Sequence, residues 1–292
     1  MPGIAVPDDA FDPAERREYE FRKADFDRVR ALIRQRAGIH LAEHKQNMVY
    51  SRLSRRLRVH AIHSFTEYLD RLERDEPFSQ TETQEFVNAL TTNLTSFFRE
   101  AHHFDALTEF LHAGTGREPP KIWCAAASTG EEPYSIAMTM MEAAAGRAPG
   151  KLLASDIDTG VLETAVRGVY RLDAVQRACG PTRPSRFFLR GTGANVGFVR
   201  VRPDLARLVE FAQVNLLATD WPLVRQFAGG AFDAVFCRNV MIYFDKSTQR
   251  EIMARIAGVL RPGGLLFVGH SENFTDCRDT FILRGKTVYQ RL

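Results

Sequence analysis

From about residue 120 onward the chain alternates short apolar runs with helical patterns, and this alternation restricts the possible folds most strongly. Buried-strand patterns occur in KIWCAAAS (121–128), KLLASDID (151–158) and FDAVFCRNV (232–240). Each is followed by a helical pattern, and the last residues, KTVYQRL, alternate like an antiparallel strand. Strands that alternate with helices favour parallel pairing. The sequence therefore predicts a doubly wound α/β sheet over residues 119–292.

The part before residue 120 has a different texture. Residues 21–91 read as a small all-α domain, because apolar residues such as Phe26, Val29 and Ile33 recur at helical spacing. Residues 1–20 read as a flexible tail, and residues 92–118 as a helical connection. Around RGTGANVG, short alternating runs separated by glycine turns predict a small antiparallel β-subdomain inserted at about residues 182–213.

The stretch IWCAAASTGEEPYSIA (122–137) predicts a strand, a ligand-binding loop and a helix. The loop has only one glycine, Gly130, whereas a dinucleotide site needs several so that a pyrophosphate can approach the backbone. Glu131 and Glu132 stand where the phosphates of a dinucleotide would lie. Each carboxylate would repel a phosphate there by about 1 kcal/mol or more. NAD and ATP are therefore disfavoured. A phosphate-free ligand with hydroxyls and positive centres fits, and S-adenosylmethionine is such a ligand.

The next strand ends in SDID, and an acid at this place holds ribose hydroxyls in nucleotide-binding sheets. Asp156 is the first candidate and Asp158 the second. The alternative is that Asp158 caps the following helix and Asp156 is a solvated loop acid.

The composition narrows the setting of the protein. No run of 18 apolar residues is present, so membrane insertion is not expected. The four cysteines form no CxxC pair, which favours a reducing, cytoplasmic location. Residues 21–63 hold eleven Lys or Arg against three acids, a local charge of +8 in a chain of net charge +3. Such asymmetry predicts that the N-terminal part meets an anionic partner.

Six motifs together identify a family: LTTNLTSFFRE, AAASTGEEPYSIA, SDIDTGVL, VNLL, FCRNVMIYFD and GGLLFVGHSENF. In this order and spacing they resemble the CheR-type chemotaxis receptor methyltransferases over about residues 20–292. The resemblance implies an all-α domain followed by a Rossmann-like methyltransferase sheet with a small β-subdomain. It also implies protein-glutamate O-methylation of chemoreceptor cytoplasmic helices with S-adenosyl-L-methionine, giving S-adenosyl-L-homocysteine and requiring no metal. The cofactor-binding residues that the motifs imply are Asn93, Thr95, Arg99, Gly130, Glu131, Asp156, Asn215, Leu216, Arg238 and Asn239, and Arg99 and Tyr243 are the catalytic candidates.

Several of these residues have plainer alternatives. Thr95 and Arg99 are four apart and would share a face if the segment were helical. Arg99 would grip the methionine carboxylate or the substrate carboxylate as a bidentate fork, or else be a surface arginine paired with Glu100 or Glu131.

Two further residues lie at the end of the FDAVFCRNV strand and just after it. Asn239 would bind the cofactor or merely satisfy backbone groups. Tyr243 would lie by the transferred methyl group, stack on the adenine, or be a core aromatic residue. The Asn-Pro-Pro-Tyr/Phe element of amino-group methyltransferases is missing here, which weakens a nucleic-acid substrate.

Two basic features suggest substrate docking. On the helix over residues 45–60, Arg52, Arg55, Arg56 and Arg58 form a face that would dock glutamate-rich receptor helices, bind RNA phosphates, or simply be solvated. In the β-subdomain, Arg190, Arg200 and Arg202 surround a hairpin that would capture a receptor's C-terminal tail peptide by strand addition, or be a structural flap.

The remaining alternatives concern the class of protein. His102, His103 and His270 are read as structural because their spacing does not indicate a metal site. A nucleic-acid methyltransferase, a cofactor-binding regulator without turnover and a dehydrogenase are the rival functions. The acidic loop opposes the dehydrogenase, and the complete set of motifs opposes the regulator.

Overall fold

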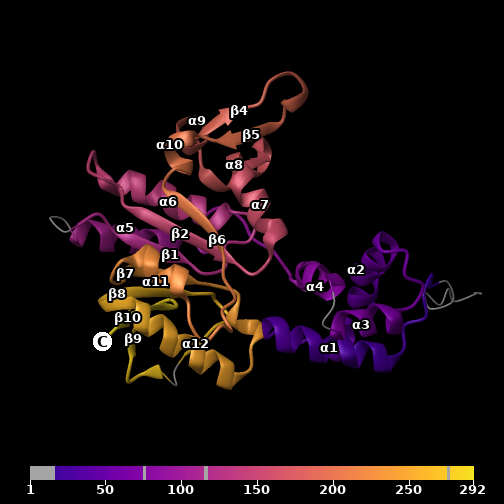
Figure 1. The fold of residues 1–292 in the computed structure, drawn as a ribbon. Coiled ribbons are helices and arrows are strands. Elements are labelled where there is room, and N and C mark those ends of the chain that lie inside the picture. Colours follow the sequence, from indigo (N-terminus) through magenta and orange to yellow (C-terminus); the bar gives the residue numbers. More distant parts are fainter. Residues whose placement is uncertain (1–16, 75–76, 115–117, 275–276) are drawn as a thin grey trace, which may run out of the picture.

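The computed structural model describes residues 17–74, 77–114, 118–274 and 277–292, which form a helical domain beside a larger α/β domain (Figure 1). The helical domain contains α1 (Lys23–Ala37), η2 (Glu43–Lys45), α2 (Gln46–Val59), α3 (Phe65–Glu73) and α4 (Pro77–Leu90). Their apolar faces share one core, in which Val29, Leu53 and Leu69 are fully buried. The predicted all-α domain is confirmed.

Residues 1–20 were expected to form a tail, and positions 1–16 of it lie outside the described residues. Residues 17–20 contact the helical domain instead of extending away from it. Glu18 accepts a hydrogen bond from Arg58 Nε at 2.9 Å, and Tyr19 packs edge-on against Phe65.

The α/β domain is built on a seven-stranded sheet with the strand order β6-β2-β1-β7-β8-β10-β9. Strands β6, β2, β1, β7 and β8 are parallel, and β10 and β9 close one edge antiparallel, which confirms the predicted last strand. The strands of this sheet are β1 (Lys121–Cys124), β2 (Lys151–Asp156), β6 (Val209–Gln213), β7 (Phe232–Cys237), β8 (Leu260–Val268), β9 (Phe281–Gly285) and β10 (Val288–Arg291).

Helices cover both faces of the sheet, as the near-continuous apolar strands require. In β1, Ile122 and Cys124 belong to the core on one face, while Trp123 between them belongs to the core on the other. The first face is covered by α5 (His102–Ala113), α6 (Glu131–Ala144) and α7 (Thr159–Arg167), and the second by α11 (Pro222–Ala228) and α12 (Lys246–Val259). The doubly wound prediction is confirmed.

A separate three-stranded antiparallel sheet projects from the α/β domain at the end away from β9 (Figure 1). It runs from residue 169 to residue 201, whereas the sequence suggested about 182–213. The difference arises because residues 209–213 form β6, which pairs with β2 in the large sheet. This β-subdomain contains β3 (Val169–Arg171), α8 (Leu172–Cys179), α9 (Arg183–Phe187), β4 (Phe188–Arg190), η3 (Gly193–Asn195) and β5 (Phe198–Val201), and α10 (Pro203–Ala206) leads back to the sheet.

Candidate functional site

A cavity of about 270 Å³ lies at the carboxyl ends of β1, β2, β6 and β7, and the helical domain forms its other wall. This is the end of a parallel sheet at which ligands bind. Most of the residues predicted for the cofactor line it, while Gly130 and Glu131 do not. The predicted residues that line the cavity are Asn93, Thr95, Arg99, Asp156, Asn215, Leu216, Arg238, Asn239 and Tyr243.

The two acids of the GEE motif begin α6 and have different surroundings. Gly130 precedes α6 with a φ of +100°, and a Cβ there would lie 2.6 Å from the Tyr170 hydroxyl. The carboxylate of Glu131 accepts a hydrogen bond from the Thr129 hydroxyl at 2.6 Å, whereas Glu132 lines the cavity. Sequence reasoning missed Glu132 as a site residue, because the pattern does not tell which of two adjacent acids points inward.

Asp156, the last residue of β2, lines the cavity and is buried. Its carboxylate accepts the backbone N–H groups of Ser128 at 2.8 Å and Asp158 at 3.0 Å. Burial raises the pKa of this carboxyl, and the two backbone donors oppose the rise. Both donors hold the side chain at the mouth of the β1–α6 loop, where oxygen atoms remain to accept hydroxyl groups.

Asp158 has the structural role that the sequence left open. Its Oδ1 accepts the N–H groups of Gly160 at 2.9 Å and Val161 at 3.2 Å, so it caps α7. Its Oδ2 accepts a hydrogen bond from Asn93 Nδ2 at 2.8 Å. Asp158 therefore also fixes Asn93, which lines the cavity.

Thr95 and Arg99 reach the cavity from an irregular segment between α4 and α5. The segment is not helical, since Phe98 and Glu100 have positive φ values of 51° and 58°, so the condition under which Thr95 and Arg99 would share a helical face is not met. Arg99 Nη1 donates to the carbonyl of Leu94 at 3.0 Å, and no ion pair joins Arg99 to Glu100 or Glu131 among the described residues.

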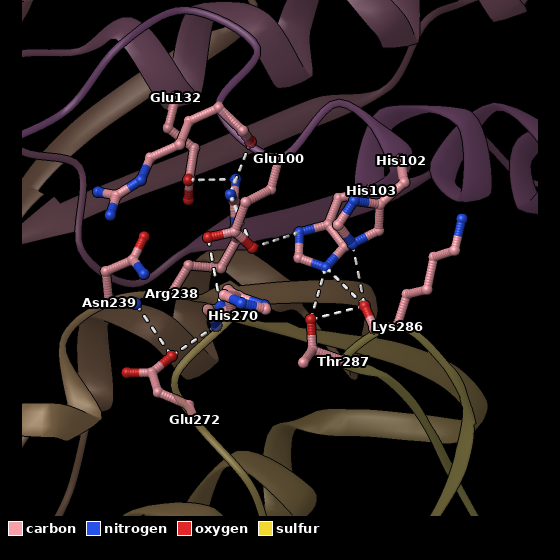
Figure 2. Close-up of polar contacts among 12 residues, drawn as sticks. Glu100, His102, His103, Glu132, Arg238, Asn239, His270, Glu272, Lys286 and Thr287 are labelled. Atoms are coloured by element: carbon pink, nitrogen blue, oxygen red, sulfur yellow. Dashed lines mark hydrogen bonds and ion pairs between the residues drawn. The ribbon is translucent and has the colours of Figure 1, made fainter.

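Arg238 follows β7 and is buried between two carboxylates (Figure 2). Its Nη1 lies 2.7 Å from Glu132 Oε2, and its Nη2 lies 3.4 Å from Glu100 Oε2. Burial raises the pKa of Glu132 and Arg238 opposes the rise. Burial also disfavours ionised Glu100, but mainly Arg238 holds the pKa of Glu100 below its usual range. Glu132 and Arg238 line the cavity whereas Glu100 does not, so Glu132 is the acid of this cluster that would face the positive centres of a ligand.

The remaining wall joins the two domains. Tyr243 packs against the helical core, and its carbonyl accepts the N–H of His40 at 2.9 Å. Asn215 Nδ2 donates to the carbonyl of Arg36 at 2.8 Å. Tyr243 is thus a packing residue as well as a residue of the cavity lining.

Glu100, His102 and His103 bring potential metal-ligating atoms within 4.8 Å of one another (Figure 2). The Nε2 atoms of both histidines lie 3.0 Å and 3.2 Å from the carbonyl of Lys286, which ties α5 to the turn between β9 and β10. Burial lowers the pKa of His103 to about 4. The guanidinium of Arg238 beside Glu100 repels a divalent cation, so the geometry favours a structural role for the histidines.

The four arginines predicted to dock a substrate do not form one free basic face. Arg52 donates to the carbonyl of Thr91 at 2.6 Å, and Arg56 Nε donates to Glu82 at 2.7 Å. Arg58 pairs with Glu18, while Arg55 is exposed and has no polar partner in the described part of the chain. In the β-subdomain, Arg190 and Arg200 are exposed, and Arg202 donates to the carbonyl of Ser185 at 3.4 Å.

The sheet with a cavity at its carboxyl end and the acidic loop without a phosphate cradle fit the class of S-adenosylmethionine-dependent methyltransferases. Comparison with known families agrees. Residues 93–290 match the CheR methyltransferase SAM-binding domain, and residues 24–91 match the CheR methyltransferase all-alpha domain. The chain belongs to the CheR methyltransferase family.

Curated relatives align over nearly their whole length. A chemotaxis protein methyltransferase of Klebsiella aerogenes is 55% identical over 91% of this chain and 89% of its own. Chemotaxis protein methyltransferase 2 of Pseudomonas aeruginosa is 52% identical over 93% and 94%. The chemotaxis protein methyltransferase of Escherichia coli is 53% identical over 91% and 90%. The solved structure of an O-methyltransferase family protein from Burkholderia thailandensis aligns with a TM-score of 0.34 at 17% identity over 79% of this chain and 55% of the other, too distant to bear on function.

The described helices include none that is long and apolar enough to cross a membrane.

Proposed function

We propose that this enzyme methylates glutamate side chains on the cytoplasmic helices of chemoreceptors, forming glutamyl methyl esters in the cytoplasm. The observation that supports this most strongly is the gathering of eight predicted cofactor residues, and of the catalytic candidate Tyr243, around one cavity that both domains line. The relatives named as chemotaxis protein methyltransferases point to the same substrate class.

The residues of the cavity fit S-adenosylmethionine. Asp156 would accept the ribose hydroxyls, and Glu132 would face the positive centres of the ligand. Asn93, Thr95, Asn215, Leu216 and Asn239 would complete the contacts. Glu131 and Gly130 would act by shaping the β1–α6 loop, since their neighbours line the cavity and they do not.

The proposed reaction requires little acid–base catalysis by the protein. When bound, S-adenosylmethionine supplies a methyl group on a sulfonium, which a carboxylate oxygen takes as the carbon–sulfur bond breaks. A glutamate with an unperturbed pKa near 4.3 is already ionised at pH 7, so no general base is needed. The chain contributes orientation and exclusion of water. Arg99 would orient the substrate carboxylate, and Tyr243 would border the place of transfer.

Arg55 would guide the acidic receptor helix toward the cavity, because it is exposed on α2 and none of the residues that the structure describes pairs with its charge. Arg190 and Arg200 would do the same for a receptor tail at the β-subdomain. Internal pairing of Arg52, Arg56 and Arg58 weakens the alternative of a nucleic-acid substrate, because the basic face has fewer free charges for phosphates.

The test uses methyl-labelled S-adenosylmethionine and membranes that carry chemoreceptors. Label on the receptor that mild alkali releases as methanol is the expected result, because carboxyl esters are alkali-labile. Label that resists alkali, or label on RNA instead of receptor, would contradict glutamate methylation.

A further inference from the structure

The loop that follows β7 forms one wall of the cavity. Arg238, Asn239, Val240 and Tyr243 from this loop line it. Asn239 has a φ of 57°, a backbone conformation that non-glycine residues keep only where the surroundings hold them. The N–H groups of Asn239 and Met241 have no backbone acceptor among the described residues. The shape of this wall therefore depends on an acceptor supplied by another segment.

Glu272, which follows β8, supplies that acceptor (Figure 2). Its Oε2 accepts the N–H of Asn239 at 2.9 Å, and its Oε1 accepts the N–H of Met241 at 2.8 Å. Oε2 also accepts the N–H of Gly269 at 2.5 Å, while the N–H of Glu272 donates to the carbonyl of Gly269 at 2.9 Å. One carboxylate thus joins the end of β8 to the loop after β7.

The two segments approach each other closely at Gly269. A Cβ on Gly269 would lie 2.3 Å from Asn239 Nδ2 and 2.8 Å from the Asn239 backbone nitrogen. Any side chain here would therefore displace Asn239 from its position in the cavity wall. Asn239 is therefore held twice: Gly269 leaves room for it, and Glu272 accepts its backbone N–H.

Glu272 is only 4% exposed and does not line the cavity. Burying a carboxylate is unfavourable unless hydrogen bonds compensate, and the three backbone donors do so here. Because Glu272 touches the loop and not the cavity, it is neither a catalytic group nor a cofactor ligand.

We propose that Glu272 is a positioning residue, which holds Asn239 and the following turn in the geometry that binds S-adenosylmethionine. This inference rests on the proposed function, because it takes Asn239 and Tyr243 as residues of the cofactor site.

The test is calorimetric binding of S-adenosylmethionine to wild type and Glu272→Gln. Glutamine keeps the size of the side chain but turns an amide NH₂ toward a backbone N–H, so the loop shifts. We expect the cofactor Kd to rise about tenfold or more, as small misplacements in active sites do to rate. The Michaelis constant for the cofactor rises with it, while that for the receptor stays unchanged.

Two controls make the result specific. Val224→Ala removes two buried methyl groups from α11, away from the cavity, so it lowers the Tm without changing the Kd by more than about twofold. Glu109→Gln changes an exposed glutamate and leaves both quantities unchanged. A Kd for Glu272→Gln within twofold of wild type overturns the proposal, and so does equal weakening by Val224→Ala.

Gly269→Ala is the second variant, since it keeps the carboxylate and displaces Asn239 directly. It is expected to weaken binding in the same way, and it decides the matter if Glu272→Gln does not fold: an unchanged Kd then overturns the proposal. Wild-type protein that fails to bind S-adenosylmethionine overturns the proposed function itself, a result distinct from equal binding by wild type and variant.

Discussion

The guanidinium of Arg238 lies 2.7 Å from the carboxylate of Glu132 at a place where both side chains are buried. Removing one partner of such a pair leaves an uncompensated buried charge. Arg238→Met leaves both Glu132 and Glu100 without their partner and is expected to lower the free energy of unfolding by about 3–5 kcal/mol. Glu132→Leu is expected to cost less, because Glu100 still lies 3.4 Å from Arg238. Urea titrations of the two single variants and the double variant would measure the coupling.

The double variant is expected to recover part of the loss, because Arg238 and Glu132 are removed together and only Glu100 is left without its guanidinium partner. The exposed pair Arg225 and Asp220, 3.1 Å apart, is the matched control. Its removal is expected to cost about 1 kcal/mol or less. Additive losses for Arg238 and Glu132 would show that the pair does not act as a unit.

Asp156→Asn tests the ribose contact. Asparagine presents one NH₂ where the carboxylate has an acceptor oxygen, so it loses charge-assisted hydrogen bonds of about 1.5–3 kcal/mol each. The Kd for S-adenosylmethionine is expected to rise about tenfold or more, measured by calorimetry at constant pH. Asp158→Asn, which affects the cap of α7, is expected to lower the Tm more than it changes the Kd. The reverse ranking would move the ribose role to Asp158.

Gly38→Ala tests the contact between the two domains. Gly38 has a φ of +71°, and a Cβ there would lie 2.8 Å from Leu217 and 2.9 Å from Phe244 of the α/β domain. Gly146 has a φ of +89° with nothing within 4 Å, so Gly146→Ala reports the backbone cost alone. We expect Gly38→Ala to be the more destabilising by about 1–3 kcal/mol, the usual cost of overpacking, in chemical denaturation. Equal losses of stability in Gly38→Ala and Gly146→Ala would mean that Leu217 and Phe244 move aside at little cost.

The buried imidazole of His103 predicts a pH dependence of stability. Burial first, and then the neighbouring Arg238 and His102, lower its pKa from the usual 6.5 to about 4, while Glu100 opposes the shift. Between pH 6.5 and 4 the unfolded chain binds a proton that the folded chain does not, so the contribution is present above pH 6.5 and is lost as the pH falls toward 4. The full loss amounts to about 3 kcal/mol.

The measurement compares unfolding free energies of wild type and His103→Asn between pH 7 and pH 4.5. The difference between the two proteins isolates His103 from the buried carboxyls Glu132, Asp156 and Glu272, whose raised pKa values act in the opposite direction. His63→Asn, at an exposed position, is expected to keep the wild-type slope. If the unfolding free energies of His103→Asn and wild type change with pH at the same slope, His103 is not the source of the pH dependence.

Arg55 and Arg56 are adjacent on α2 but have different surroundings. Arg55→Glu is expected to slow receptor methylation about threefold or more at low salt, with Tm and cofactor Kd unchanged, because an exposed charge acts mainly on association. Arg56→Ala is expected to lower the Tm, since it removes the guanidinium beside the buried Glu82 and leaves that carboxylate only Tyr68 and His60. Initial methylation rates over a salt series, beside thermal unfolding, separate the two effects.

Local patterns were sufficient to predict the alternation of strands and helices, both domains and the acids at the ends of β1 and β2. Long-range contacts were not predictable in this way. The pairing of Arg238 with Glu132 joins residues 106 positions apart, and the partners of Arg56 and Arg58 come from other parts of the chain. The positive φ values of Phe98 and Glu100 likewise depend on tertiary contacts, so the helical connection expected from residue 92 begins only with α5 at His102.

The wall shared by the two domains also affects how the enzyme responds to heat. Each domain has its own apolar core, so without a ligand the two are free to melt at different temperatures. A ligand held by His40 of the helical domain on one side and by Tyr243 and Asp156 of the α/β domain on the other is lost when either domain opens. Its binding energy then stabilises both domains at once, so the supply of cofactor in the cell would set how cooperatively the enzyme unfolds.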